Sequence, residues 1–158
     1  MKTRIPLSAV VAIAVAGFAT TLRADEQDTK AVQAANDQFY VALNALFTGD
    51  AEPMKAVWSH KDDITYMGPV GDYRMGWKSV EEEWDAQAAK KLGGKVGPQQ
   101  VRISAGRDVA VVSCYEVGEN QVDGAQPVKI RCTSIFRKEG GKWKMIGHHT
   151  DTLPFLQK

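Results

Sequence analysis

The second half of the sequence alternates strand-like runs with turn residues, and this pattern restricts the fold more than any other feature. Each run is rich in β-branched and aromatic residues, which favour strands. The four runs are 100–105, 109–119, 128–138 and 142–152. Turn residues separate them at 106–108, 122–127 and 140–141. Because consecutive strands joined by short connections pair side by side, we predict a meandering antiparallel sheet.

The first half shows helical periodicity instead. Apolar residues recur every three or four positions over 29–48, which predicts an amphipathic helix with one buried face. We also expect a short helix over 52–58, a short strand over 64–67, and a third helix over 80–92 with Ser79 as its cap. Three helices followed by a sheet predict an α+β fold in which the helices cover one face of the sheet.

The first 24 residues have the layout of a secretory signal peptide. Lys2 and Arg4 precede an uncharged apolar run, and small residues lie near Ala24. We predict cleavage after Ala24, with Ala19 as a second site. A membrane anchor is the alternative, because the run is nearly long enough to span a bilayer. The remaining domain, 25–158, would be periplasmic or secreted and free of the membrane.

Composition narrows the expected partners. With 158 residues the chain is long enough to form one domain with a substantial core. Removal of the signal peptide leaves 17 of the 20 basic residues against 19 acidic ones, with no basic block. Nucleic-acid binders carry basic patches, so nucleic acid is not an expected partner.

Export makes the two cysteines a candidate disulfide, since oxidising compartments permit one. Cys114 and Cys132 are symmetric about Asp123 in the predicted loop, so they would lie directly opposite on paired strands. Their Cβ atoms would be close enough to bridge, although bridges between directly paired strands are often strained. Two small buried thiols are the alternative. A cysteine-based zinc site has no third ligand-like residue adjacent in sequence.

The last strand carries two adjacent histidines, and its register decides which one faces the helices. Regular pairing about the Gly-Gly turn places His149 opposite Cys132. His149 then looks toward the helices together with Cys114 and Ser134. A one-residue bulge would reverse the sidedness and bring in His148 instead.

The opposite face of the predicted sheet carries an apolar strip flanked by charges. The strip consists of Val109, Val111, Tyr115 and Val117. An apolar strip on an exposed sheet face predicts a homodimer interface.

A series of short motifs occurs in order along the chain. They are Phe39-Tyr40-Val41-Ala42-Leu43-Asn44, Gly49-Asp50, Trp58-Ser59-His60, Gly68-Pro69-Val70-Gly71, Gly76-Trp77, Phe136-Arg137, Gly141-Lys142-Trp143-Lys144 and His148-His149. Together they resemble the nuclear transport factor 2-like superfamily, especially its SnoaL-like and ketosteroid-isomerase-like bacterial members. The resemblance covers nearly all of the mature chain. It implies a cone-shaped, curved antiparallel sheet packed against three N-terminal helices around a pocket, usually as a dimer. It does not by itself imply an activity.

The functional positions of ketosteroid isomerases can be compared one by one. The resemblance aligns their general base with Gly68, their phenolic donor with Phe39, and their protonated acid with Ser134. Tyr40 lies one position away from the donor. Proton abstraction beside a carbonyl needs a base and oxyanion donors, and these residues do not supply them. We therefore expect no ketosteroid isomerase activity.

Other family members that dehydrate or cyclise substrates use a pocket histidine with a carboxylate. His149 is that candidate here, or His148 after a register shift, with Asp62, Asp63 or Asp151 to orient it. A core histidine bonded to a neighbouring hydroxyl or carbonyl is the alternative.

Two further sets of residues are candidates for binding. A weaker metal site would need His60, His148 and His149 to come together. The expected ligand-binding side chains are aromatic, apolar or polar, and are Tyr40, Tyr66, Met67, Tyr73, Trp77, Ser134 and His149. Filling of the core is the alternative role for Trp77 and Trp84.

Three functions fit these patterns. The first is binding of a small, partly apolar molecule in the pocket, with no cofactor. The second is a cofactor-independent SnoaL-like isomerase, dehydratase or cyclase. The third is a dimeric structural or interaction module, which a cavity packed with Trp77, Trp84 and Met67 would favour.

Overall fold

The chain folds into one sheet with helices packed against it. The computed structural model describes residues 26–121 and 124–152, so the predicted signal peptide and its cleavage site lie outside the described residues. Within these residues the elements are α1 (Glu26–Leu46), α2 (Glu52–Val57), β1 (Thr65–Met67), β2 (Tyr73–Met75), α3 (Trp77–Lys90), β3 (Lys95–Ala105), β4 (Val109–Asn120), β5 (Gln126–Glu139) and β6 (Lys142–Asp151). This arrangement confirms the predicted α+β class. Among the described helices, none is both long and apolar enough to cross a membrane.

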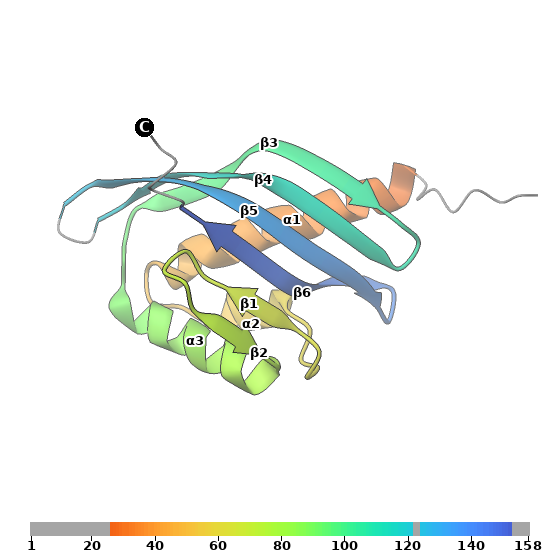
Figure 1. The fold of residues 1–158 in the computed structure, drawn as a ribbon, viewed down its shortest axis with the longest axis horizontal. Helices are drawn as coiled ribbons and strands as arrows, with labels where there is room; N and C mark the ends of the chain where they lie inside the picture. Colours follow the sequence, from red (N-terminus) through yellow and green to blue (C-terminus); the bar gives the residue numbers. More distant parts are fainter. Residues whose placement is uncertain (1–25, 122–123, 153–158) are drawn as a thin grey trace, which may run out of the picture.

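All six strands belong to one curved sheet with the order β2-β1-β6-β5-β4-β3 (Figure 1). Strands β3 to β6 form the predicted antiparallel meander. The prediction missed β2, and it missed the parallel pairing of β1 with β6, which joins Thr65 to Gly147. The parallel pair brings an early segment against the last strand, which local sequence patterns do not report.

The helices supply the other layer of the fold. Figure 1 shows α1 running along one face of the sheet, with α2 and α3 beside β1 and β2. Val32, Phe39 and Leu46 form part of the buried face of α1. Helix α3 begins directly after Gly76, whose φ of 77° is in the left-handed region that favours glycine. Ser79 therefore lies inside the first turn and makes no cap hydrogen bond, so the predicted cap is wrong.

A β-bulge between β5 and β6 decides which histidine faces the helices. Ile146 is an extra residue on β6, and beyond it His148 pairs with Ser134. His148 is buried on the helix-covered face, whereas His149 is half-buried on the opposite face. The expectation from regular pairing, that His149 faces the helices, is therefore wrong. One added residue reverses which side chains of the strand beyond it face the helices.

Large side chains fill the space between the sheet and the helices. Trp58, Trp84, Phe39 and Phe136 are almost completely buried there. Trp58 and Trp84 pack with their ring centroids 5.7 Å apart. Trp77 is only half-buried, so it does not belong to this packed centre.

Candidate functional site

A polar cluster is buried on the helix-covered face of β4, β5 and β6. Glu116 and His148 are 4% and 3% exposed, and Ser134 is fully buried. Nε2 of His148 lies 3.4 Å from Oε1 of Glu116, and Nδ1 hydrogen-bonds to Oγ of Ser134 at 3.0 Å. The hydroxyl of Tyr40, from α1, donates to Oε1 of Glu116 at 3.2 Å. A carboxylate, an imidazole and two hydroxyls therefore form one connected chain inside the cone.

Strand alternation places the carboxylate in this cluster. Val112, Cys114 and Glu116 are successive inward positions of β4, so Glu116 occupies a site that otherwise takes core residues. Sequence patterns alone do not single out Glu116, although its parity with Val112 and Cys114 is an available signal. A buried carboxylate needs polar partners; Tyr40 donates a hydrogen bond to Glu116, and Nε2 of His148 lies 3.4 Å from it.

The two cysteines extend the cluster. Cys114 and Cys132 lie directly opposite one another, as predicted, and both are free thiols in this structure. The hydroxyl of Tyr40 lies 3.2 Å from Sγ of Cys114 and 3.9 Å from Sγ of Cys132. Sγ of Cys132 also lies 3.5 Å from Oγ of Ser134 and 3.7 Å from Nδ1 of His148. Burial is the main cause that raises the pKa of Tyr40, and the hydrogen bond with Cys114 is the main cause that raises the pKa of Cys132.

Aromatic rings pack beside the cluster. The ring of Tyr66 lies parallel to that of His148, with an interplanar angle of 4° and centroids 6.1 Å apart. The hydroxyl of Tyr66 accepts a hydrogen bond from Nε2 of Gln87 at 3.0 Å, and burial raises its pKa. Three of the predicted ligand-binding residues, Tyr40, Tyr66 and Ser134, therefore gather around His148.

Several buried donors have no hydrogen-bond partner among the described residues. They include the side-chain amide of Asn36 and the indole N–H groups of Trp58 and Trp84, all in residues at most 1% exposed. Trp84 packs on Tyr66 with ring centroids 4.6 Å apart. Asn36 lies one helical turn before Tyr40 on the same face of α1. Asn36, Trp58 and Trp84 thus bring polar groups without a described partner into the space between the helices and the sheet.

The other predicted site residues lie away from this cluster. His149 hydrogen-bonds to Thr65 at 3.1 Å on the opposite face of the sheet, where burial lowers its pKa. Tyr73 is 55% exposed on β2. Trp77 stacks on His60 with ring centroids 3.9 Å apart.

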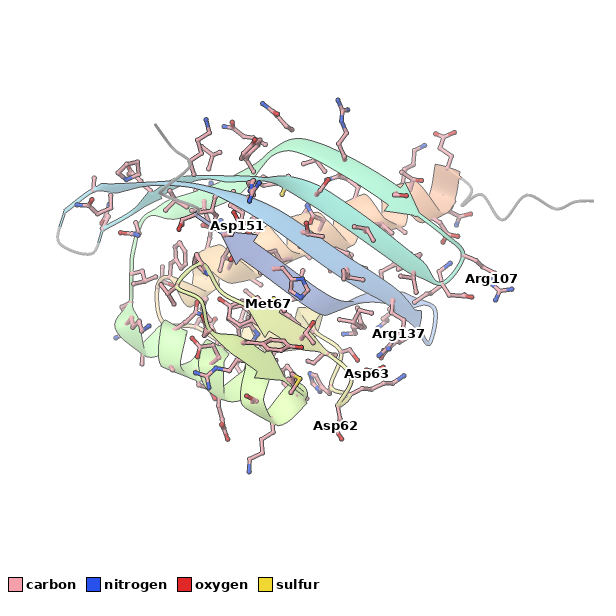
Figure 2. All side chains as sticks on the ribbon, in the orientation of Figure 1. Asp62, Asp63, Met67, Arg107, Arg137 and Asp151 are labelled. Carbon is pink, nitrogen blue, oxygen red and sulfur yellow. The ribbon has the colours of Figure 1, made fainter. Side chains whose placement is uncertain are left out.

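Asp63, a predicted catalytic carboxylate, pairs with an arginine instead of a histidine. Nη1 and Nη2 of Arg137 donate to its carboxylate at 2.6 and 3.0 Å, and this pairing lowers the pKa of Asp63. Figure 2 shows Asp63 and Arg137 pointing toward one another, away from Met67 and Asp151. Asp151 pairs with Arg131 at 2.9 Å.

The outer face of the sheet carries an open hollow of about 640 Å³. Its lining comprises Met67, Gln100, Ser113–Tyr115, Arg131–Thr133 and His149–Asp151. Because alternate residues point to opposite faces, the side chains of Cys114 and Cys132 turn into the cone while their strand neighbours form the walls. Met67 and His149 therefore belong to this outer hollow and not to the cone.

One group of metal-ligating side chains is assembled within the described part of the chain. The ligand atoms of Glu116, Cys132 and His148 all lie within 4.8 Å of one another, and the three residues are buried. His60 and His149 lie outside this group, so the predicted three-histidine site is not formed. The assembled group draws one residue from each of three strands, which spacing along the sequence does not reveal.

Known proteins share this fold. The family model for the SnoaL-like domain matches residues 32–152 of the sequence. No curated protein matches the chain. Among solved structures, a "putative dehydratase from the NTF2-like family" of Streptomyces avermitilis aligns with a TM-score of 0.73 and 22% identity, over 82% of this chain and 99% of that one.

Two further structures from other bacteria agree. A protein of unknown function with a cystatin-like fold from Nostoc punctiforme gives a TM-score of 0.67 at 19% identity, over 85% of this chain and 99% of that one. An NTF2-like protein of unknown function from Pseudomonas putida gives a TM-score of 0.68 at 17% identity, over 82% of this chain and 88% of that one. These likenesses confirm the predicted nuclear transport factor 2-like fold. With the match over 32–152, they place the chain in the SnoaL-like domain family.

Proposed function

We propose that the protein binds a small, largely apolar molecule with oxygen acceptors between the sheet and the helices, in space that the packed side chains open on binding. The observation that carries this proposal is the set of unpaired buried donors on Asn36, Trp58 and Trp84. Each unpaired N–H destabilises the fold by about 1–3 kcal/mol, and an acceptor oxygen on a bound molecule would remove that penalty. The surrounding aromatic rings suit a flat or apolar body.

The polar cluster supports the same proposal. Among its described contacts none comes from a lysine or an arginine, so Glu116 is buried beside only neutral or weakly basic partners. A well-packed apolar core of similar volume is often at least as stable as a buried charged pair. Buried polar side chains often gather at functional sites, where a few of them orient the polar end of a ligand.

Membership of the SnoaL-like family supports either a ligand-binding role or an isomerase- or dehydratase-type role. Of these two roles, the unpaired donors favour ligand binding. They can hold the oxygen atoms of a bound molecule, and this requires no reaction. We also propose that the protein is exported and pairs with a second copy. The signal-like layout of residues 1–24 supports export, and the exposed side chains of Val109 and Val111 support pairing.

The binding proposal can be tested with 1-anilinonaphthalene-8-sulfonate, which combines flat apolar rings with sulfonate oxygens. We expect a saturable fluorescence increase with one probe per chain. Trp84→Phe keeps an aromatic ring but loses the N–H, so it should weaken the affinity about tenfold, the effect of one hydrogen bond.

Trp143→Phe is the matched control. It also removes an unpaired buried indole N–H, but the ring of Trp143 lies at the start of β6 beside Lys138. Its affinity for the probe should equal that of the wild type. Absence of saturable binding, or equal weakening by Trp84→Phe and Trp143→Phe, would contradict the proposal. Native mass spectrometry of protein from its own host would identify any molecule that stays bound.

A further inference from the structure

Three different metal-binding atoms meet inside the cone. Glu116, Cys132 and His148 offer an oxygen, a sulfur and a nitrogen from the adjacent strands β4, β5 and β6. The three atoms lie within 4.8 Å of one another, and each residue is more than nine-tenths buried. Among the described residues this is the only such group.

The spacing between the imidazole and the carboxylate is longer than a hydrogen bond between them would be. Nε2 of His148 lies 3.4 Å from Oε1 of Glu116, whereas charge-assisted N–H···O bonds measure about 2.7–2.9 Å. Two ligand atoms that each lie about 2.0–2.2 Å from one tetrahedral zinc ion are about 3.3–3.6 Å apart. The two atoms therefore stand at the spacing of ligands on a shared ion.

Ser134 determines which ring nitrogen faces the carboxylate. Its Oγ hydrogen-bonds to Nδ1 of His148 at 3.0 Å, so Nε2 is left to face Glu116. Metal-binding histidines usually have their second nitrogen held in this way, which fixes the tautomer and the ring orientation. Cys132 contacts the ring at the nitrogen that Ser134 holds, with Sγ 3.7 Å from Nδ1, so its side chain would turn toward Nε2 to share the ion. The ligand atoms lie within 4.8 Å of one another, which is wider than the spacing around a tetrahedral zinc ion. The most distant of them would have to move roughly 1 Å toward the others when the ion binds.

We propose that Glu116, Cys132 and His148 bind one divalent transition-metal ion of the zinc class. Zinc accepts this mixture of oxygen, sulfur and nitrogen in tetrahedral geometry, whereas magnesium and calcium prefer oxygen ligands. Three protein ligands leave the fourth position of a tetrahedral ion to an oxygen donor. The hydroxyl of Tyr40, 3.2 Å from Oε1 of Glu116, is the candidate for this position. This inference does not depend on the small-molecule binding proposed above.

Cobalt(II) is the probe for this site. Tetrahedral cobalt has strong visible d–d bands, and a bound thiolate adds a charge-transfer band in the near ultraviolet. The reduced protein is unfolded and refolded with cobalt, because a buried site fills most readily while the chain folds. After desalting, we expect one equivalent of cobalt and both spectral features, and added zinc should displace the cobalt and abolish the bands.

Variants separate this group from other donors. Cys132→Ser should lose the charge-transfer band, and Glu116→Gln should weaken cobalt binding at least tenfold while keeping an acceptor for the hydroxyl of Tyr40. Cys114→Ser is the matched control, because Cys114 is the buried cysteine directly opposite Cys132. It should retain one equivalent of cobalt and the charge-transfer band. Circular dichroism establishes that each variant is folded.

Three results would overturn the proposal. The first is a refolded wild-type protein that binds no cobalt. The second is a charge-transfer band that persists in folded Cys132→Ser. Bands that disappear in His149→Ala but persist in Cys132→Ser would assign the ion to the outer hollow, which also overturns the proposal.

Discussion

Arg137 and Asp63 form a surface ion pair that couples the stability of the protein to pH. Arg137 holds the pKa of Asp63 below its ordinary value, and Asp63 in turn raises the pKa of Arg137. Because the pKa of Asp63 is lower in the folded than in the unfolded state, the pair stabilises the fold above the ordinary aspartate pKa of about 3.9. This contribution is lost as the pH falls through the folded-state pKa.

Asp63→Asn removes the titrating group and tests this coupling. We expect a slightly lower urea midpoint than that of the wild type at pH 7, since Asp63 is 60% exposed and exposed pairs contribute little. The difference between the two midpoints should shrink as the pH falls from about 5 to about 2. Asp62→Asn is the matched control and should change the midpoint less at pH 7. A difference that stays constant over this range would refute the lowered pKa.

Residue patterns also show which parts of the site were predictable. Tyr40, Tyr66 and Ser134 were expected near the pocket, and the structure places them around His148. Glu116 was missed because a charged residue in a strand usually faces solvent. The parity of Glu116 with the buried positions of β4 contradicts that expectation, but only where the inward face of the strand is known.

At the scale of elements, the turn between β5 and β6 was easier to predict than the register beyond it. The Gly140-Gly141 dipeptide marks the turn, and the strands start as expected from it. The bulge at Ile146 has no turn residue of its own. It accompanies a close contact, because a Cβ on Gly147 would lie 3.2 Å from Cδ1 of Ile135. Contacts between strands fix such a shift, and one-residue shifts reverse the facing of the histidines.

Two glycines on paired strands test how closely β3 and β4 approach. A Cβ on Gly118 of β4 would overlap the carbonyl oxygen of Lys95 on β3, whereas a Cβ on Gly97 of β3 would meet no atom within 4 Å. We expect Gly118→Ala to lower the free energy of unfolding by about 1–3 kcal/mol. Gly97→Ala should change it by less than about 0.5 kcal/mol. Urea denaturation measures both, and equal effects would show that the backbone contact at Gly118 does not limit packing.

At the scale of the whole molecule, the apolar strip on the exposed face of the sheet predicts that two copies of the protein form a homodimer. Val109 and Val111 are 47% and 39% exposed on the sheet face that the helices leave uncovered. We expect a second copy to cover this face, because soluble chains rarely leave such strips open. Light scattering should show a dimer for the wild type and a monomer for Val111→Lys. Val41→Lys, at a 70% exposed position on α1, should remain dimeric. A wild-type monomer at every concentration would exclude this interface.

The position of the last strand also determines when the protein can fold. Strand β6 lies between β5 and β1, and it brings together Thr65 and His149, which are 84 residues apart. A chain made from its N-terminus cannot close this sheet until β6 has been synthesised, and such long-range pairing forms slowly. An exported chain that crosses the membrane before folding gains from this delay. Under the export proposed above, the order of the strands would keep the newly made polypeptide open for translocation until the sheet closes on the far side.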